Sequence, residues 1–321
     1  SLLLRMLSVR NLSASFHTRA GIVRAVRNVS FDVAPGATLG IVGEYGSGKS
    51  VTCYSMMWLI PMPPGRIESG SAMLDGTDLL RCPEKELRAI RGKRISMIFQ
   101  DPMASLNERA KVEYIVAEGL LNHHLYKDQN DLHEKVMNAL HEVGLLPEFA
   151  SRFPHEFSGG QRQRIGIARA LVMEPEFIVA DEPLSALDVS IQAQVVNLLG
   201  ALKEQLGLTL LFISHDLDVV EYLCDRVVVL HLGQVLAEGL PDAIRSDPAV
   251  RDAASREWAL WEDTHISIGT GTLGRNPRWG DDDYRLAFAR LATHYWSHDG
   301  FLNPLILDRM DRLQKIPATL I

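Results

Sequence analysis

A glycine-rich stretch, GEYGSGKS at residues 43–50, has the residue types and spacing that bind nucleotide phosphates. Its glycines permit a tight turn that points backbone N–H groups at phosphate oxygens. Lys49 can reach the β- and γ-phosphates, and the Ser50 hydroxyl can bind magnesium. The residues expected to contact ATP are Gly43, Glu44, Tyr45, Gly46, Ser47, Gly48, Lys49, Ser50 and Val51.

Polar side chains also follow three apolar segments, each typical of a buried strand. Gln100 follows the first, Asp181 and Glu182 end the second, and His215 follows the third. Ligands of open α/β sheets bind at the carboxyl ends of parallel strands, so these side chains are expected to meet the glycine-rich stretch at one sheet edge. The three segments are Ile95–Phe99, Phe177–Glu182 and Leu208–Ile213.

These side chains suit phosphate hydrolysis. Asp181 would hold magnesium directly or through water, and Glu182 would orient or deprotonate the attacking water. Gln100 could bind magnesium or position water, and His215 could bond a γ-phosphate. Each also has an ordinary interpretation, because acids at strand ends often cap helices and isolated Gln or His residues are more often solvated or structural.

Two further features have a functional and an ordinary interpretation. Ser158, Gly159, Gly160 and Gln161 precede a strong helix pattern, so they form either a second anion site or a simple helix cap. Phe16 is either a platform for an adenine ring or part of the core.

The surrounding sequence predicts an α/β fold. Alternating strands and a turn at Pro35-Gly36 precede the buried strand that enters the glycine-rich stretch, and proline- and glycine-rich β structure precedes Ile95. The expected strands of the first part are 7–10, 13–16, 23–33 and 38–42. The expected helical regions are 51–59, 83–91, 108–150 and 162–171.

Composition limits the partners. The 321 residues carry a net charge of −7 and no basic stretch, which argues against nucleic acid. The three cysteines, Cys53, Cys82 and Cys224, form neither a metal-ligand spacing nor a disulfide framework, as expected in a reducing cytosol. No apolar run has the length of a membrane span, so any work at a membrane is expected to go through a partner.

The stretch from about Leu7 to Gly239 resembles the ATP-binding subunits of ABC transporters, in particular the oligopeptide and dipeptide importers. GEYGSGKS matches Walker A, IFQDPMASLN the Q-loop with Gln100, and FSGGQ the signature motif. FIVADE matches Walker B with a catalytic Glu182, SALD the D-loop with Ser185 and Asp188, and His215 the switch histidine. Phe16 falls where the family has its adenine-stacking aromatic residue.

This resemblance implies a nucleotide-binding domain at 1–245, built as a RecA-like P-loop NTPase core with an antiparallel β layer and a helical signature subdomain at about 101–170. It implies ATP hydrolysis with Mg²⁺, catalysed by Glu182, His215 and Gln100, with Ser50, Gln100 and Asp181 at the metal. Two domains would close head to tail, so that Ser158–Gln161 of one acts on the ATP of the other.

The resemblance also implies partners and a location. The second ATP-binding subunit would be the same chain or a different one, and the Q-loop region and helical subdomain would contact an integral membrane permease. An extracytoplasmic solute-binding protein would deliver the solute, and the subunit would lie peripherally on the cytoplasmic face of the inner membrane.

Alternatives remain open. Importers of nickel or other small solutes share many of these sequence motifs. ABC ATPases that do not act in transport are soluble proteins that usually carry two cassettes or a long coiled-coil insertion. Tyr45 replaces a small serine usual in the group, and the cysteine-rich segment usual near the C-terminus is absent. The bulky ring would either slow closure of a dimer or add stacking area.

The C-terminal residues 249–321 do not resemble the ABC transporter subunits. They hold Trp258, Trp261, Trp279 and Trp296, and they resemble a mainly helical fragment of the cap of proline iminopeptidase, an α/β-hydrolase. The chain contains no G-x-S-x-G nucleophile elbow, so peptidase activity is not expected. The tail is interpreted as a fusion or assembly accident, with a recruited regulatory or docking appendage as the alternative.

Overall fold

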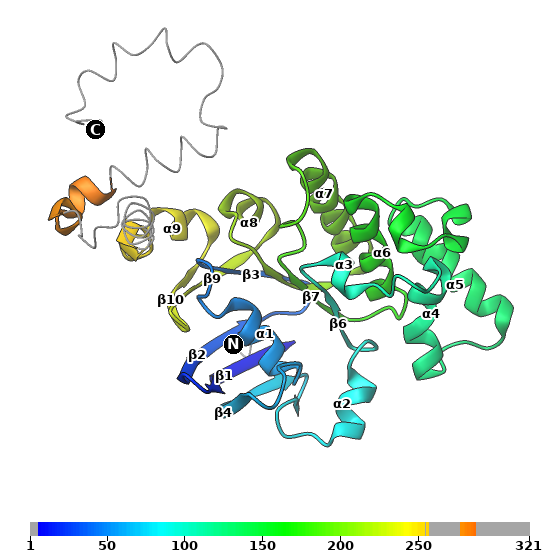
Figure 1. Cartoon of the computed structure of the whole chain (residues 1–321), viewed down its shortest axis with the longest axis horizontal. Coiled ribbons are helices and arrows are strands. Elements are labelled where there is room, and N and C mark those ends of the chain that lie inside the picture. The colour runs from blue at the N-terminus through cyan, green and yellow to red at the C-terminus, as the bar shows by residue number, and fades with distance from the viewer. Residues whose placement is uncertain (1–5, 254, 257–276, 287–321) are drawn as a thin grey trace, which may run out of the picture. The chain divides into compact units, whose positions relative to one another are not determined.

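The computed structural model describes residues 6–253, 255–256 and 277–286. The contacts within the chain divide it into two units, Ser1–Ser246 and Asp247–Ile321, and each is described by itself. The first unit contains two sheets and a group of helices (Figure 1). This confirms the predicted α/β fold with a parallel core sheet, an antiparallel β layer and a helical region.

The core sheet positions the candidate catalytic residues. Its strand order is β10-β9-β3-β8-β7-β6, and all its strands except β10 run parallel. Every residue of β3, β7 and β8 is buried, which is why these segments read as continuous apolar runs. The strands are β3 (Thr38–Val42), β6 (Ile95–Ile98), β7 (Phe177–Asp181), β8 (Thr209–Ile213), β9 (Arg226–His231) and β10 (Gln234–Gly239).

The second sheet is antiparallel, with the order β2-β1-β4-β5. The segments predicted as separate strands at 7–10 and 13–16 are one irregular strand, because Asn11 adopts a left-handed conformation (φ 49°) and the pairing register shifts there. The buried faces of both sheets share one hydrophobic core. The strands are β1 (Leu7–Thr18), β2 (Gly21–Val33), β4 (Gly65–Leu74) and β5 (Thr77–Asp78).

Helix α1 (Lys49–Met56) follows the glycine-rich stretch, and its Cys53 and Met56 side chains are buried in that core. The predicted helix at 51–59 was therefore placed too late at both ends. The helix starts directly after Gly48, and it stops before Trp58, which has a positive φ of 53°.

A helical group lies to one side of β6 in Figure 1. Helix α6 (Gly159–Leu171) is central to it and contacts α3, α4, α5, α7 and β6. The other helices are α2 (Glu84–Ile90), α3 (Pro102–Ser105), α4 (Val112–His123), α5 (Gln129–Glu142), α7 (Val189–Leu206), α8 (Leu217–Leu223) and α9 (Pro241–Ser246), with short 3₁₀ turns η1 (Pro147–Ser151) and η2 (Pro154–Glu156).

The described part of the second unit is organised around Arg285, whose side chain is 2% exposed. Its guanidinium donates to Ser255 Oγ at 3.0 Å, the Trp279 carbonyl at 2.8 Å, Asp282 Oδ1 at 2.8 Å and Asp252 Oδ1. Residues 248–253, 255–256 and 282–286 are helical, and η3 spans Pro277–Gly280. Most of the predicted tail, including Trp258, Trp261 and Trp296, lies outside the described residues, so its hydrolase-fragment interpretation stays a prediction.

Candidate nucleotide site

The phosphate loop, residues 43–48, is shaped by glycines between β3 and α1. Gly43 and Gly48 have φ values of 151° and 96°, which L side chains rarely adopt. A Cβ atom at Gly43 would lie 2.2 Å from the Leu230 carbonyl oxygen, and one at Gly48 would lie 2.4 Å from that of Ala25. The backbone therefore passes too close to two neighbouring strands for any other residue type.

The loop fits a phosphate group. No side chain of the described residues caps the N-terminus of α1, so its first N–H groups are available to an anion. The Lys49 side chain is 5% exposed, and its Nζ donates to the carbonyls of Gly43 at 2.8 Å and Glu44 at 3.1 Å. The buried Ser47 hydroxyl has no hydrogen-bond partner among the described residues.

Ser50 and Asp181 meet at the start of α1 and the end of β7. The Ser50 hydroxyl donates to Asp181 Oδ1 at 2.8 Å, whereas the buried Oδ2 has no hydrogen-bond partner in the described part of the chain. Burial raises the pKa of Asp181, and the nearby Tyr54 and Ser50 side chains partly oppose this shift. An orphaned carboxylate oxygen beside a hydroxyl fits a magnesium ion. Among the described ranges, no cluster of three His, Cys, Asp or Glu side chains could hold a metal.

The other two predicted catalytic side chains, Gln100 and His215, and the predicted phosphate-binding Lys49 converge on Glu182, directly after β7. Its Oε1 lies 3.4 Å from Lys49 Nζ, and its Oε2 accepts a hydrogen bond from Gln100 Nε2 at 3.2 Å. His215 Nδ1 lies 3.7 Å from the same Oε2. Glu182 has a left-handed φ of 41°, a strained conformation for a residue with a side chain.

Charge around Glu182 sets its protonation. The neighbouring His215 imidazole lowers the pKa of Glu182 most, and Lys49 adds to this effect against the opposing influence of burial. In return, Glu182 raises the pKa of His215. The carboxylate is thus held ionised, as a group that accepts a proton from water must be.

A small cavity of about 30 Å³ adjoins this carboxylate, with room for a water molecule. The Ser185 hydroxyl of the predicted D-loop donates to the Glu182 carbonyl at 3.1 Å. The cavity is lined by Glu182, Pro183, Leu184, Ser185, Gln192, Ser214, His215 and Asp216.

The Ser158–Gln161 segment forms a helix cap in the single chain. Ser158 N–H donates to Gln161 Oε1 at 3.0 Å, and the Ser158 hydroxyl accepts from Gln161 N–H at 3.4 Å. Asp188 likewise caps α7, accepting from Ile191 N–H at 3.0 Å. Among the described residues, no hydrogen bond or ion pair joins residues 158–161 to the phosphate loop. Within the described part of one chain, the signature lies beside the D-loop, where a Cβ atom at Gly159 would lie 3.7 Å from the Leu187 side chain, and is not bonded to the phosphate loop.

Three predicted nucleotide contacts stand apart from this network. Phe16 is half-buried on β1, opposite Val23 of β2 and Gly65 of β4. Tyr45 is 98% exposed at the phosphate loop, and Val51 packs against the hydrophobic core. The contacts of these residues with nucleotide stay predictions.

Sequence reasoning missed the residues that back the loop. Leu230 and Ala25 approach it through their carbonyl groups, and Tyr54 neighbours Asp181 from the middle of α1. The first two are distant in sequence and contribute only backbone atoms, so no side-chain pattern indicates them. Tyr54 lies four residues after Ser50, on the same helix face, which is a signal that helical spacing could have provided.

The ABC transporter family matches residues 26–185. A second family, the branched-chain amino acid ATP-binding cassette transporters, matches residues 234–253. The chain is 47% identical to the oligopeptide transport ATP-binding protein AmiF of Streptococcus pneumoniae, over 76% of this chain and 78% of that protein. It is 52% identical to a provisionally named peptide import ATP-binding protein of Brucella ovis, over 72% of this chain and 71% of that protein.

Solved structures of ATP-binding cassettes are also similar to this chain. The dimeric ATP-binding cassette MJ0796, in a post-hydrolysis state with ADP and Pi, is 27% identical with a TM-score of 0.66, over 74% of this chain and 99% of that chain. The cbiO1 protein of Clostridium perfringens, part of the transporter complex cbiONQ, is 26% identical with a TM-score of 0.64, over 82% and 99%. The chain therefore belongs to the ABC transporter family, as one of its ATP-hydrolysing, ATP-binding subunits.

Proposed function

We propose that this ATPase energises the import of peptides through a membrane permease. The convergence of Lys49, Gln100 and His215 on Glu182 carries the proposal that these residues perform the hydrolysis. The relatives named for oligopeptide transport and peptide import support the solute class.

In this proposal the phosphate loop and Lys49 hold the phosphates of ATP. A bound phosphate competes with Glu182 for the Lys49 ammonium, which frees the carboxylate to accept a proton from water in the adjacent cavity. His215 donates a hydrogen bond to the γ-phosphate. Asp181, Ser50 and Gln100 would hold Mg²⁺, which would neutralise phosphate charge.

The proposed active unit is a dimer. The signature residues Ser158–Gln161 cap α6 at an exposed end of the helix. Among the described residues, they are not bonded to the phosphate loop of the same chain. They would complete the site of a second subunit, with Ser185 and Asp188 of the D-loop at the same interface. The similarity to a dimeric cassette supports this arrangement.

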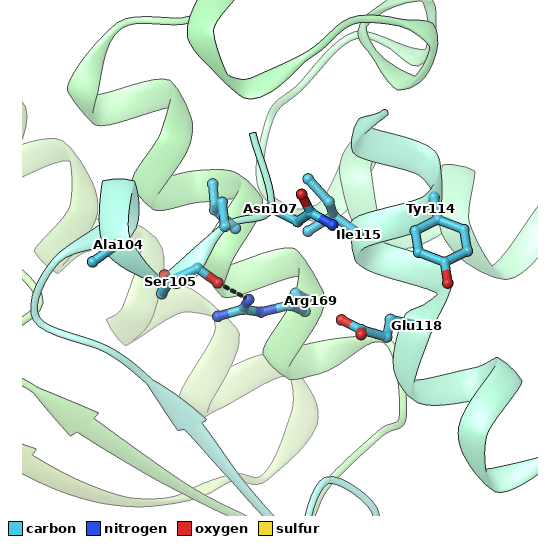
Figure 2. A pocket seen from close by; sticks show the side chains of 8 residues that line it. Ala104, Ser105, Asn107, Tyr114, Ile115, Glu118 and Arg169 are labelled. Atoms are coloured by element: carbon cyan, nitrogen blue, oxygen red, sulfur yellow. Dashed lines mark hydrogen bonds between the residues drawn. The ribbon is translucent and has the colours of Figure 1, made fainter. Parts of the chain in front are cut away.

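The proposed permease contact is a pocket of about 320 Å³ in the helical region (Figure 2). Arg169 of α6 lies across it and donates to the Ser105 carbonyl at 2.5 Å, while Tyr114 and Glu118 border it from α4. The Arg169 guanidinium also lies over the Phe99 ring at 5.7 Å. Because Phe99 adjoins Gln100, a permease segment in this pocket would be joined to the hydrolytic site through a short chain of contacts.

None of the helices among the described residues has the length and apolarity needed to cross a bilayer. We place the subunit peripherally on the cytoplasmic face of the inner membrane, held there by the permease. An extracytoplasmic solute-binding protein would supply the peptide from the other side.

Uptake of labelled di- to hexapeptides tests this function in a strain that lacks the gene. The intact gene should restore uptake, and a Lys49→Ala copy should not, because it lacks the phosphate-binding ammonium. Branched-chain amino acid and nickel uptake are measured beside it, since one family match points to amino acid transporters. Restored uptake of one of these solutes, with peptide uptake unaffected by the gene, would contradict peptide import.

A further inference from the structure

The phosphate loop is bonded to the turn between β9 and β10. Gly233 N–H, in this turn, donates to the Ser47 carbonyl of the loop at 2.9 Å, and Arg27 N–H of β2 donates to the Gly233 carbonyl at 2.7 Å. One residue of the turn thus joins the loop to a strand of the other sheet.

The Arg27 side chain holds the same turn. Its Nε donates to the Leu232 carbonyl at 3.0 Å, and its Nη2 donates to the same oxygen. Leu232 and Gly233 both have positive φ values, 47° and 79°, and a leucine is strained in that conformation. The Arg27 guanidinium therefore donates to the carbonyl of Leu232, the turn residue with the strained backbone conformation.

The phosphate loop, β2 and the β9–β10 turn approach one another closely through their backbones. A Cβ atom at Gly48 would lie 2.4 Å from the Ala25 carbonyl oxygen and 3.4 Å from Gly233 Cα. A Cβ atom at Gly233 would lie 2.6 Å from the same Ala25 oxygen. The loop cannot shift toward β2 or the turn without displacing backbone.

We propose that Arg27 is a positioning residue for nucleotide binding, which fixes the shape of the phosphate loop through the Leu232-Gly233 turn. Arg27 touches no nucleotide in this proposal, which rests on the proposed phosphate-binding role of residues 43–50. A loop fixed before ATP arrives loses less freedom on binding. The loop binds phosphates in the ground state and the transition state alike, so loss of the clamp raises KM and leaves kcat nearly unchanged.

The test compares Arg27→Ala with Arg24→Ala, which removes the same charge from an exposed position on the same strand. Arg27→Ala should raise KM for ATP, and Kd for ADP measured by calorimetry, by roughly 3- to 10-fold, with kcat within about twofold. Arg27→Lys, which keeps one donor, should recover part of the loss. Arg24→Ala should match the parent.

A second pair tests the turn itself. Gly233→Ala meets the Ala25 carbonyl, whereas Gly76→Ala has a similar φ of 84° with nothing within 4 Å of the new Cβ. Gly233→Ala should weaken ADP binding more than Gly76→Ala does. Unchanged KM and Kd in Arg27→Ala, or a fall in kcat alone, would overturn the clamp. A parent protein that binds no nucleotide would instead overturn the proposed function of the loop.

Discussion

Glu182 makes two contacts in the structure that its proposed role in hydrolysis requires to change. Its carboxylate lies 3.4 Å from the Lys49 ammonium and also accepts from Gln100. The Lys49 ammonium cannot pair fully with Glu182 and with a phosphate at the same time. Nucleotide binding and release of the carboxylate are therefore expected to occur together.

Lys49→Ala should weaken ATP binding by roughly 10- to 100-fold, the scale of lost charge-assisted hydrogen bonds. Lys85→Ala, on the exposed surface of α2, removes an equal charge and should bind as the parent does. Calorimetric titration with ATP and EDTA measures both without turnover. Equal affinity in the two variants would mean that Lys49 serves only to hold the loop carbonyls.

For individual residues, the sequence predicted which side chains share a sheet edge but not the contacts that they make there. Asp181 and Glu182 end one apolar segment and His215 follows another, and both segments are typical of buried parallel strands, so a shared edge was predicted. The Lys49–Glu182 pair was not, because it depends on side-chain directions at two turns distant in sequence. The close passage of Gly43 by the Leu230 carbonyl is a backbone contact that leaves no side-chain pattern.

Among the elements, Asp225 links strand β3 of the core sheet to helix α7. Its Oδ2, in the connection before β9, accepts from Thr38 N–H at the start of β3 at 2.7 Å and from Lys203 Nζ of α7 at 2.9 Å. Burial opposes ionisation of this carboxyl, but the Thr38 N–H and the Lys203 ammonium together lower its pKa. Asp225 therefore stabilises the fold as a carboxylate.

Asp225→Asn should lower the free energy of unfolding by about 0.5–1 kcal/mol at pH 7, a modest loss because the side chain is half exposed. The folded pKa lies below the unfolded value of about 3.9, so the contribution is complete above that pH and is lost as pH falls through the folded pKa.

Urea unfolding of parent and variant between pH 7 and pH 3.5 measures this difference. The gap should be constant down to about pH 4 and shrink below it. Glu204→Gln, exposed on α7, serves as the control and should leave unfolding unchanged throughout. A gap that widens on acidification would contradict the assigned role of Asp225.

The elements themselves were largely predictable. The buried strands β3, β7 and β8 and helix α6 were indicated by continuous apolar runs and by helical spacing. The errors lie at ends and irregularities, such as the single strand β1 with its kink at Asn11 and the early stop of α1 before Trp58. Both depend on positive φ at residues with side chains, which tertiary contacts impose and sequence patterns do not reveal.

For the whole molecule, the division at Ser246 separates the nucleotide site from the C-terminal unit. Every candidate site residue, from Phe16 to His215, belongs to the first unit. The second unit has its own buried centre at Arg285, bonded to Asp252, Ser255, Trp279 and Asp282. We therefore propose that the first unit carries out catalysis.

A protein shortened to residues 1–246 should keep the kcat and KM for ATP within about twofold of the full chain, and we expect it to be more soluble. Steady-state phosphate release and static light scattering measure the two properties. The full chain should not hydrolyse proline arylamides, because it has no nucleophile elbow. Loss of ATPase activity on truncation would show that the C-terminal unit is a working part of the enzyme.

The assignment of Glu182 as the general base of a two-subunit ATPase is tested most directly by Glu182→Gln. The amide keeps the shape of the side chain but cannot accept the proton of the attacking water. ATP turnover should fall by ~10²-fold or more while ATP affinity is retained, and multi-angle light scattering in saturating Mg-ATP should show a dimer. Hydrolysis at the parental rate would remove Glu182 from this role, and a persistent monomer would contradict a site shared between two copies of this chain.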